Sequence, residues 1–193
     1  MLADISPTIN CITTHRLWNR AIAVSRTRHR EELQMEVEIV RVREEDKSVL
    51  ANLVQFYRYD FSSRRGFDLN EHGTYTYRYL DHYFLDDARI AFFLRYEGKL
   101  AGFALVRSHD GVHELAEFFV LRLYRRRGFG RSAATQIFKR FPGEWRLSID
   151  ENNDEASWFW QAIIPSVASD RNVGTSTNQE FRDQAEFHFA VLP

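Results

Sequence analysis

The chain has 193 residues, 44% hydrophobic and 27% charged, and this ordinary globular composition predicts one domain with a single core. Its formal net charge of −1 argues against a dedicated nucleic-acid binder. No apolar run approaches the roughly 20 residues that cross a bilayer. The single cysteine, Cys11, excludes an intrachain disulfide framework and a multi-cysteine zinc site. We therefore expect a cytoplasmic protein with no membrane contact and no bound metal.

Residues 1–34 differ in composition from the rest of the chain. They contain five arginines, Asp4 is the only acid before Glu31, and they lack the apolar stretch of a secretory signal. Such a composition is also found in transit peptides, but we favour a poorly ordered or partly helical extension. Met35, directly before the first strand-like run, fits a start position. The predicted organisation is thus an extension at 1–34 and a folded domain at 35–193.

The remaining residues predict alternating strands and helices. In order, we expect a strand at 37–42, a helix through Val49 to Tyr57, a loop at 60–73 and a second helix from Tyr75, ending near Asp86. The later elements are strands at 90–96, 100–107, 113–121, 145–150 and 187–191, with helices at 133–141 and from Asn152 or Asn153 to Pro165. The order β-α-α-β-β-β-α-β-α-β predicts an α/β (α+β) fold, with helices flanking a mixed, mostly antiparallel sheet.

A turn rich in arginine and glycine separates the apolar strand at 113–121 from the helix that follows. Its sequence is Val120-Leu121-Arg122-Leu123-Tyr124-Arg125-Arg126-Arg127-Gly128-Phe129-Gly130-Arg131-Ser132. The first amides of a helix lack backbone partners and attract anions, and glycines let an anion approach them. The turn lacks the Gly-Lys-Ser/Thr of a Walker loop and the third glycine of the dinucleotide fingerprint. We expect it to bind phosphate; a solvated basic surface and an RNA contact are the alternatives.

The whole pattern resembles the coenzyme A signature of the GNAT superfamily of N-acetyltransferases, in which backbone amides hold the pyrophosphate of acetyl-CoA. The family usually has proline at the position of Arg122, a departure that should affect the bend more than the chemistry. Residues 153–160 resemble the family's later Asn-x-x-Ala-x-x-Phe-Tyr helix, which implies that Asn153 contacts the pantetheine arm. The cofactor-binding residues implied by the resemblance are Phe118, Val120, Arg125, Arg126, Arg127, Gly128, Phe129, Gly130, Arg131, Ser132 and Asn153.

Two glutamates in the apolar strand, Glu117 and Glu114, are candidates for a general base. A carboxylate among apolar neighbours has a raised pKa, which suits that role. In a regular strand Glu117 would share a face with Leu115 and Phe119, and Glu114 would face the other way, unless a bulge alters the alternation. The alternatives are a structural ion pair for Glu117 and a solvent-exposed strand end for Glu114. The resemblance further implies that the amide of Val120 or Phe118 polarises the thioester.

The general acid is not evident, because Trp160 stands where many relatives have a tyrosine, and an indole does not titrate in this role. Six of the eight tyrosines lie between positions 57 and 83, which suggests that this segment lines a pocket. We expect Tyr57, Tyr59 and Tyr83 to contact substrate, and one of them, or water, to protonate the thiolate.

These features predict an N-acetyltransferase that moves an acetyl group from acetyl-CoA to a primary amine of a small molecule or peptide, with a glutamate as general base. A non-catalytic acyl-CoA-binding regulator and acetylation of tRNA-borne amino acids are the alternatives. The acceptor and the oligomeric state, including a homodimer, are left open.

Overall fold

The computed structural model describes residues 36–150, 152–169, 174–177 and 184–193, so the extension predicted at 1–34 lies outside the described residues. These residues form a seven-stranded sheet in the order β1-β2-β3-β4-β5-β7-β6. The strands are β1 (Glu38–Arg41), β2 (Arg89–Tyr96), β3 (Lys99–His109), β4 (Val112–Val120), β5 (Gly143–Asp150), β6 (Gly174–Thr177) and β7 (Gln184–Val191). The predicted mixed, mostly antiparallel sheet with flanking helices is confirmed.

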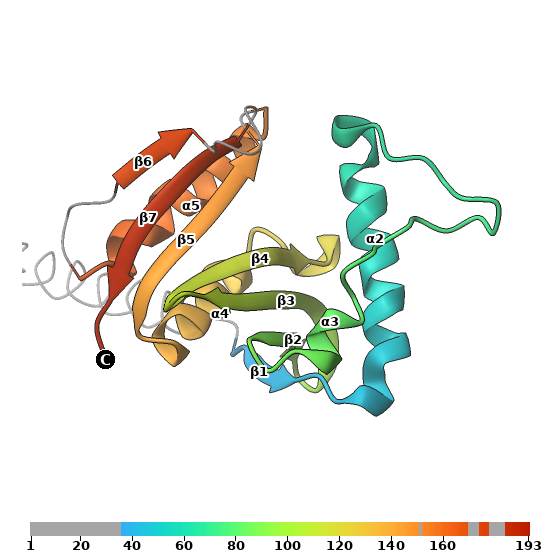
Figure 1. Ribbon diagram of the computed structural model, residues 1–193, viewed down its shortest axis with the longest axis horizontal. Helices are drawn as coiled ribbons and strands as arrows, with labels where there is room; N and C mark the ends of the chain where they lie inside the picture. The colour runs from blue at the N-terminus through green and yellow to red at the C-terminus, as the bar shows by residue number, and fades with distance from the viewer. Residues whose placement is uncertain (1–35, 151, 170–173, 178–183) are drawn as a thin grey trace, which may run out of the picture.

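Helices cover both faces of the sheet (Figure 1). Helices α2 (Lys47–Arg65) and α3 (His82–Leu85) pack on one face, where Phe93, Phe103 and Phe119 form a core with the apolar side of α2. Helices α4 (Phe129–Arg140) and α5 (Asp154–Val167) pack on the other face, over a second core. Two short 3-10 helices, η1 (Glu44–Asp46) and η2 (Arg122–Tyr124), lead into α2 and toward α4. The sheet is therefore the middle layer of three.

The sheet opens between β4 and β5, its parallel pair of strands. Their pairing joins only Val112–Glu114 to Glu144–Arg146, after which β4 continues to Val120 without β5 beside it. Figure 1 shows β5 and β7 diverging from β4 beyond this short contact. A wedge-shaped opening results, with backbone groups of β4 along one side. Within the described residues, no helix is both long and apolar enough to cross a membrane.

Two predicted boundaries in the first half were wrong. Helix α2 continues through the expected loop to Arg65, because no residue breaks it before Gly66, which ends it with a φ of 64°. The helix predicted from Tyr75 is reduced to the four residues of α3. The Gln55 side chain bonds both backbone groups of Tyr75, accepting from its N–H at 2.7 Å and donating to its C=O at 3.1 Å. These bonds tie the chain to α2 before a helix can begin.

The second half departs from expectation in two places. Helix α5 passes Pro165, the predicted end, and continues two residues further to Val167. Strand β6 was not predicted, since its four residues are small and polar. By contrast, Asn153 caps α5 as expected: its side-chain oxygen accepts from the N–H of Ala156 at 3.2 Å.

Candidate active site

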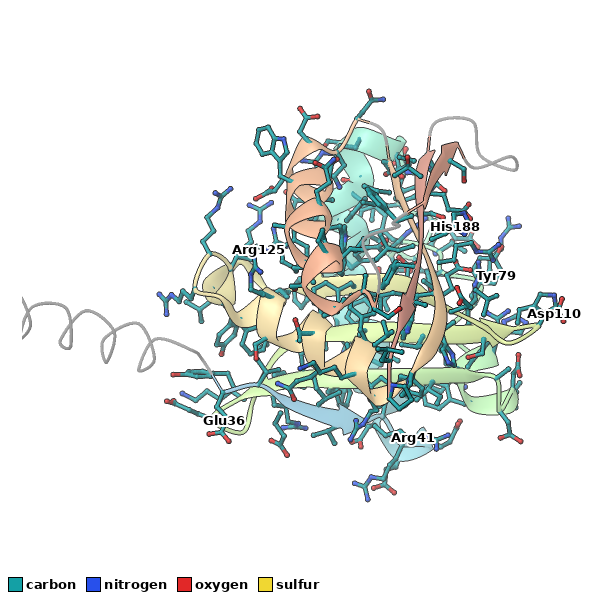
Figure 2. All side chains as sticks on the ribbon, turned by 90° about the vertical axis from the view of Figure 1, so that its left-hand side faces the viewer. Glu36, Arg41, Tyr79, Asp110, Arg125 and His188 are labelled. Atoms are coloured by element: carbon teal, nitrogen blue, oxygen red, sulfur yellow. The ribbon has the colours of Figure 1, made fainter. Side chains whose placement is uncertain are left out.

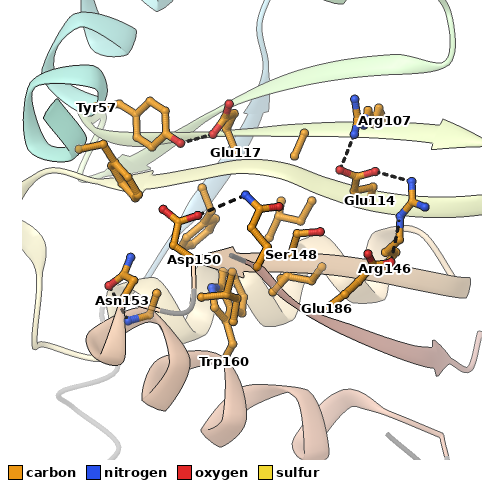
Figure 3. Close-up of a pocket in the computed structure, with 18 of the residues that line it drawn as sticks. Tyr57, Arg107, Glu114, Glu117, Arg146, Ser148, Asp150, Asn153, Trp160 and Glu186 are labelled. Carbon is orange, nitrogen blue, oxygen red and sulfur yellow. Dashed lines mark hydrogen bonds and ion pairs between the residues drawn. The ribbon is translucent and has the colours of Figure 1, made fainter. Parts of the chain in front are cut away.

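A cavity of ≈ 810 Å³ occupies the wedge between β4 and β5, with α2 along one wall. Figure 3 shows Glu117, Asp150 and Asn153 around it, with Trp160 at its floor. The residues predicted for the site that line it are Tyr57, Tyr83, Glu114, Glu117, Phe118 and Asn153. The turn at 120–132, which we predict to bind phosphate and therefore call the phosphate-binding turn, lies outside the cavity wall and leads into α4. Groups expected for chemistry and groups expected for cofactor binding thus occupy neighbouring regions.

A β-bulge in β4 places both glutamates on one face. Leu105 of β3 pairs with Glu117, whereas the next residue, Val106, pairs with Leu115, so one residue of β4 is extra. Leu115 therefore packs in the core under α4 and α5, and Glu114 and Glu117 both line the cavity. The opposite facing of the two glutamates that a regular strand would give does not occur, because the strand contains the bulge that was named as the exception.

Glu117 lies between two tyrosine hydroxyls. Tyr57 donates a hydrogen bond to its Oε2, and Tyr77 donates one to its Oε1 at 3.2 Å. Burial raises the pKa of the Glu117 carboxyl, and the hydrogen bonds from the tyrosines only partly oppose this. A carboxylate with a raised pKa is a stronger base than an exposed one, so this environment suits acceptance of a proton.

Glu114 is held by two arginines. Arg107 donates to its Oε1 at 2.7 Å and Arg146 to its Oε2 at 2.9 Å (Figure 3). Burial opposes ionisation of Glu114, but the two arginines outweigh it and lower the pKa. Because a carboxylate stabilised in this way is a poor proton acceptor, we propose a structural role for Glu114 and reserve the role of base for Glu117.

We expect Glu114→Gln to lower the free energy of unfolding by about 1–3 kcal/mol, since it leaves two arginines without their shared partner. The lower end applies if water compensates Arg107 and Arg146, whose side chains are each 41% exposed. A lowered pKa stabilises the fold above the ordinary value of 4.5, and this contribution is lost as the pH falls through the lowered pKa. Urea unfolding at neutral and acid pH measures both effects. A wild-type stability profile in the variant would contradict this role.

The tyrosines that line the cavity are not the same as those predicted to do so. Tyr57 and Tyr83 line it as predicted, and Tyr77, which was not singled out, bonds Glu117. Tyr59 does not line it and is 65% exposed, because two residues along a helix turn a side chain by roughly 200°. Burial, together with the charge of Glu117, raises the pKa values of Tyr57, Tyr77 and Tyr83. These phenols remain protonated donors at neutral pH.

The phosphate-binding turn has the backbone expected of an anion site. Gly128, with a φ of 78°, caps the N-terminus of α4, and Arg126 before it also has a positive φ of 61°. The first amides of α4 then point out of the helix end without helical partners. The buried side chain of Phe129 leaves only its backbone for a ligand. Arg126 pairs at 2.7 Å with Glu155 on α5, and both side chains are exposed.

Arg125 connects this turn to the rest of the site. Its Nε donates to the carbonyl of Val120 at 2.6 Å, and its guanidinium also bonds Asp60 on α2. Arg122 bonds the same carboxylate at 2.7 Å. Burial opposes ionisation of Asp60, but the two arginines outweigh it and lower its pKa. Asp60 is thus an anchor between α2 and the phosphate-binding turn, and sequence reasoning missed it because it was placed in a loop.

We expect Asp60→Asn to weaken acetyl-CoA binding by about 3–10-fold, because Arg125 would no longer be held and could not keep the turn in place. The loss of a charged hydrogen bond commonly costs about 1.5–3 kcal/mol. We expect a smaller cost here, because Arg122, which shares the carboxylate, is exposed to solvent. Titration calorimetry measures the affinity. Asp87→Asn, an exposed carboxylate beyond α3, is the matched control. An affinity equal to that of the control would show that the turn holds its shape without Asp60.

Two amides of β4 face the opening. The N–H of Leu121 bonds Ala101 on β3 at 2.8 Å, and alternate residues of a strand direct their backbone groups to opposite sides. The amides of Phe118 and Val120 therefore point away from β3, toward the wedge. The Val120 carbonyl has the same direction, since Arg125 reaches it from that side. These amides are available to an oxyanion that develops in the wedge.

Comparisons with known proteins agree with this geometry. The model of the acetyltransferase (GNAT) family matches residues 52–162, more than half of the chain. The chain belongs to the GNAT family of acetyltransferases. No curated protein sequence matched it. The family assignment supports an N-acetyltransferase enzyme, and the family uses acetyl-CoA as its acetyl donor.

Solved structures share the GNAT fold at low sequence identity. An acetyltransferase from Thermus thermophilus has a TM-score of 0.63 and 15% identity, over 82% of this chain and 99% of that one. A spermidine N-acetyltransferase from Vibrio cholerae, in complex with CoA and spermine, has a TM-score of 0.56 and 15% identity, over 81% and 95%. The Escherichia coli ribosomal-protein-S18-alanine N-acetyltransferase has a TM-score of 0.53 and 14% identity, over 82% and 96%. At such identities the likeness extends to the fold alone.

Proposed function

We propose that this GNAT enzyme transfers an acetyl group from acetyl-CoA to a primary amine, with Glu117 as the general base. The observation that carries the proposal is the position of Glu117: a carboxylate with a raised pKa, held by Tyr57 and Tyr77, in the wall of the wedge that the unpaired amides of β4 also face.

The residues present fit acetyl-CoA along one path. The amides at the start of α4 and the exposed Arg127 suit the pyrophosphate. Asn153 uses its oxygen to cap α5, so a pantetheine contact would fall to its amide nitrogen. The thioester would then lie in the wedge, where the Phe118 and Val120 amides can donate to its carbonyl oxygen as negative charge develops there.

The chemistry requires a neutral amine. A lysine-like amine has a pKa of about 10.4, and deprotonating it near pH 7 costs on the order of 4–5 kcal/mol. Glu117 accepts this proton as the nitrogen attacks the acetyl carbonyl, and the thiolate of coenzyme A leaves. The raised pKa values of Tyr57 and Tyr83 make them weaker acids, so we assign the proton that the thiolate takes up to water.

Release of free thiol from acetyl-CoA, measured with a panel of amines, tests the proposal. We expect turnover that depends on the amine and yields the N-acetylated product by mass spectrometry. Hydrolysis of acetyl-CoA at one rate with every amine, or no thiol release, would overturn it.

A further inference from the structure

Among the described residues, one cation on the cavity wall has no carboxylate partner. Arg58, on α2, lines the cavity beside Tyr57, and its guanidinium carbon lies 3.3 Å from the centroid of the Phe67 ring. Its Nε is buried without a hydrogen-bond partner, and Arg58 forms no ion pair within the described part of the chain. Stacking on a ring leaves the N–H groups at the edge of a guanidinium open, in the fork that matches a carboxylate or phosphate.

Each of the other arginines that line the cavity forms an ion pair with a carboxylate. Their ion pairs are Arg65 with Asp150, Arg89 with Asp86, Arg107 with Glu114, and Arg146 with Glu114 and Glu186. A buried donor without a partner is costly, because it has lost its water and gained nothing in return. Nε itself is enclosed by the protein, so an anionic ligand in the cavity would bond the terminal N–H groups of the Arg58 guanidinium.

The described carboxylates that line the cavity are paired in the same way, except for one. Glu114, Glu186 and Asp150 each have an arginine partner, so Glu117, between its two tyrosines, is the wall carboxylate left for an ammonium group. A polyamine carries several ammonium groups, but among the described residues this wall offers only Glu117 as an unpaired carboxylate, and the positive charge of Arg58 would repel the remaining ammonium groups. We therefore expect polyamines to bind poorly here. Arg58 and Glu117 line the same cavity, and the charge of Arg58 is among the influences that oppose the raised pKa of Glu117.

We infer that the acceptor is an amine that also carries an anionic group, a carboxylate or a phosphate, with its nitrogen at Glu117 and its anion on Arg58. The inference rests on the proposed acetyl transfer and specifies its substrate class. The acceptor is bound as an ion pair at each end, which sets the nitrogen against the thioester. Spermidine, by contrast, is a poor acceptor here, although the fold is shared with the Vibrio cholerae spermidine enzyme.

The test compares amines that differ only in the anion. L-alanine is paired with ethylamine, phosphoethanolamine with ethanolamine, and spermidine stands as the polycation. We expect kcat/KM to be about 10–100-fold higher for the anionic member of at least one pair, the range that a charged hydrogen bond supports, and the pair with the larger ratio identifies carboxylate or phosphate. Preference for spermidine, or for the member of each pair that lacks the anion, would overturn the inference while leaving acetyl transfer in place.

Variants at Arg58 separate recognition from folding. Arg58→Gln should abolish the preference for the anionic member of each pair, mainly by raising its KM, so that the ratio of kcat/KM within the pair falls toward one. Arg64→Gln removes the same charge from an exposed position of α2 and should retain the preference. Equal losses for all amines in Arg58→Gln would contradict the inference.

A binding measurement covers the case in which no amine is acetylated, which would refute the proposed function. L-alanine and phosphoethanolamine are then added with coenzyme A, and the melting temperature is recorded. A rise that wild type and Arg64→Gln show and Arg58→Gln lacks supports the anion site on its own. The same response in all three proteins would overturn it.

Discussion

Glu117→Gln is expected to lose about 10²–10⁴-fold in kcat near neutral pH, the usual contribution of a general base, while binding acetyl-CoA almost unchanged. The glutamine keeps the size of the side chain and one acceptor for Tyr57 or Tyr77, but it cannot take up a proton. The deficit should shrink as the pH rises, because more of the amine then arrives already neutral. Steady-state rates across pH, with calorimetry for acetyl-CoA, measure both properties.

The direction of the pKa shift gives a second readout for the same variant. Because the pKa of Glu117 is raised in the folded protein, its ionised form opposes folding at neutral pH, and the neutral glutamine should be no less stable than wild type. Wild-type activity should fall as the pH drops through this raised pKa, and the variant should lack that step. Glu144→Gln, at an exposed position of β5, is the control. Unchanged turnover, or a variant that mainly loses stability, would remove Glu117 from the mechanism.

Gly128→Glu is expected to abolish the protection against heat that acetyl-CoA gives the fold. A ligand at 100 times its dissociation constant adds about 2.7 kcal/mol, or roughly 5–10 °C for a chain of this size. Gly128 has open space around it, so the new side chain meets no atom, although its φ of 78° strains any residue other than glycine; the side chain carries its negative charge to the start of α4, where the pyrophosphate would bind. Thermal melts with and without acetyl-CoA provide the measurement.

The control separates the charge at this site from backbone strain. Gly111 has a φ of 80° and equally open space, in the turn between β3 and β4, so Gly111→Glu imposes the same strain and charge elsewhere. Figure 2 shows the neighbouring Asp110 at the opposite end of the molecule from Arg125 of the phosphate-binding turn. Gly111→Glu should retain the full acetyl-CoA shift. A normal shift in Gly128→Glu would show that the pyrophosphate binds elsewhere.

Local patterns were enough to predict most of the fold. Alternation and helical spacing located β1 to β5 and β7, and the gap left between the predicted strands at 90–96 and 100–107 is a turn in which Glu97 and Gly98 have positive φ. The errors arose where distant parts of the chain decide the outcome. Gln55 bonds the backbone of Tyr75, where a helix was expected to begin, and these bonds join positions 20 residues apart.

The site was predictable to the extent that a motif is contiguous. The phosphate-binding turn and Asn153 carry their signal in neighbouring residues, and Glu117 stood out as an acid in an apolar strand. Asp60, Tyr77 and Arg58 have no such signal, because their importance comes from partners that only the folded chain brings near. A bulge in β4 was considered, but its position could not be read from the sequence, because it is defined by pairing with β3.

Because β4 and β5 pair over only a few residues, single substitutions can change the width of the wedge between them. Among the described residues, the ladder between β4 and β5 is limited to Val112–Glu114, and farther out the contacts across the wedge are between side chains, such as Arg65 of α2 with Asp150 of β5 and Phe118 of β4 with Trp160 of α5. Side chains change by single substitutions, whereas a backbone ladder changes only by rebuilding a strand. The width of the wedge is therefore open to point mutation at its outer end while each half keeps its own pairing. Evolution and protein engineering can both use that freedom to admit acceptors of a new size.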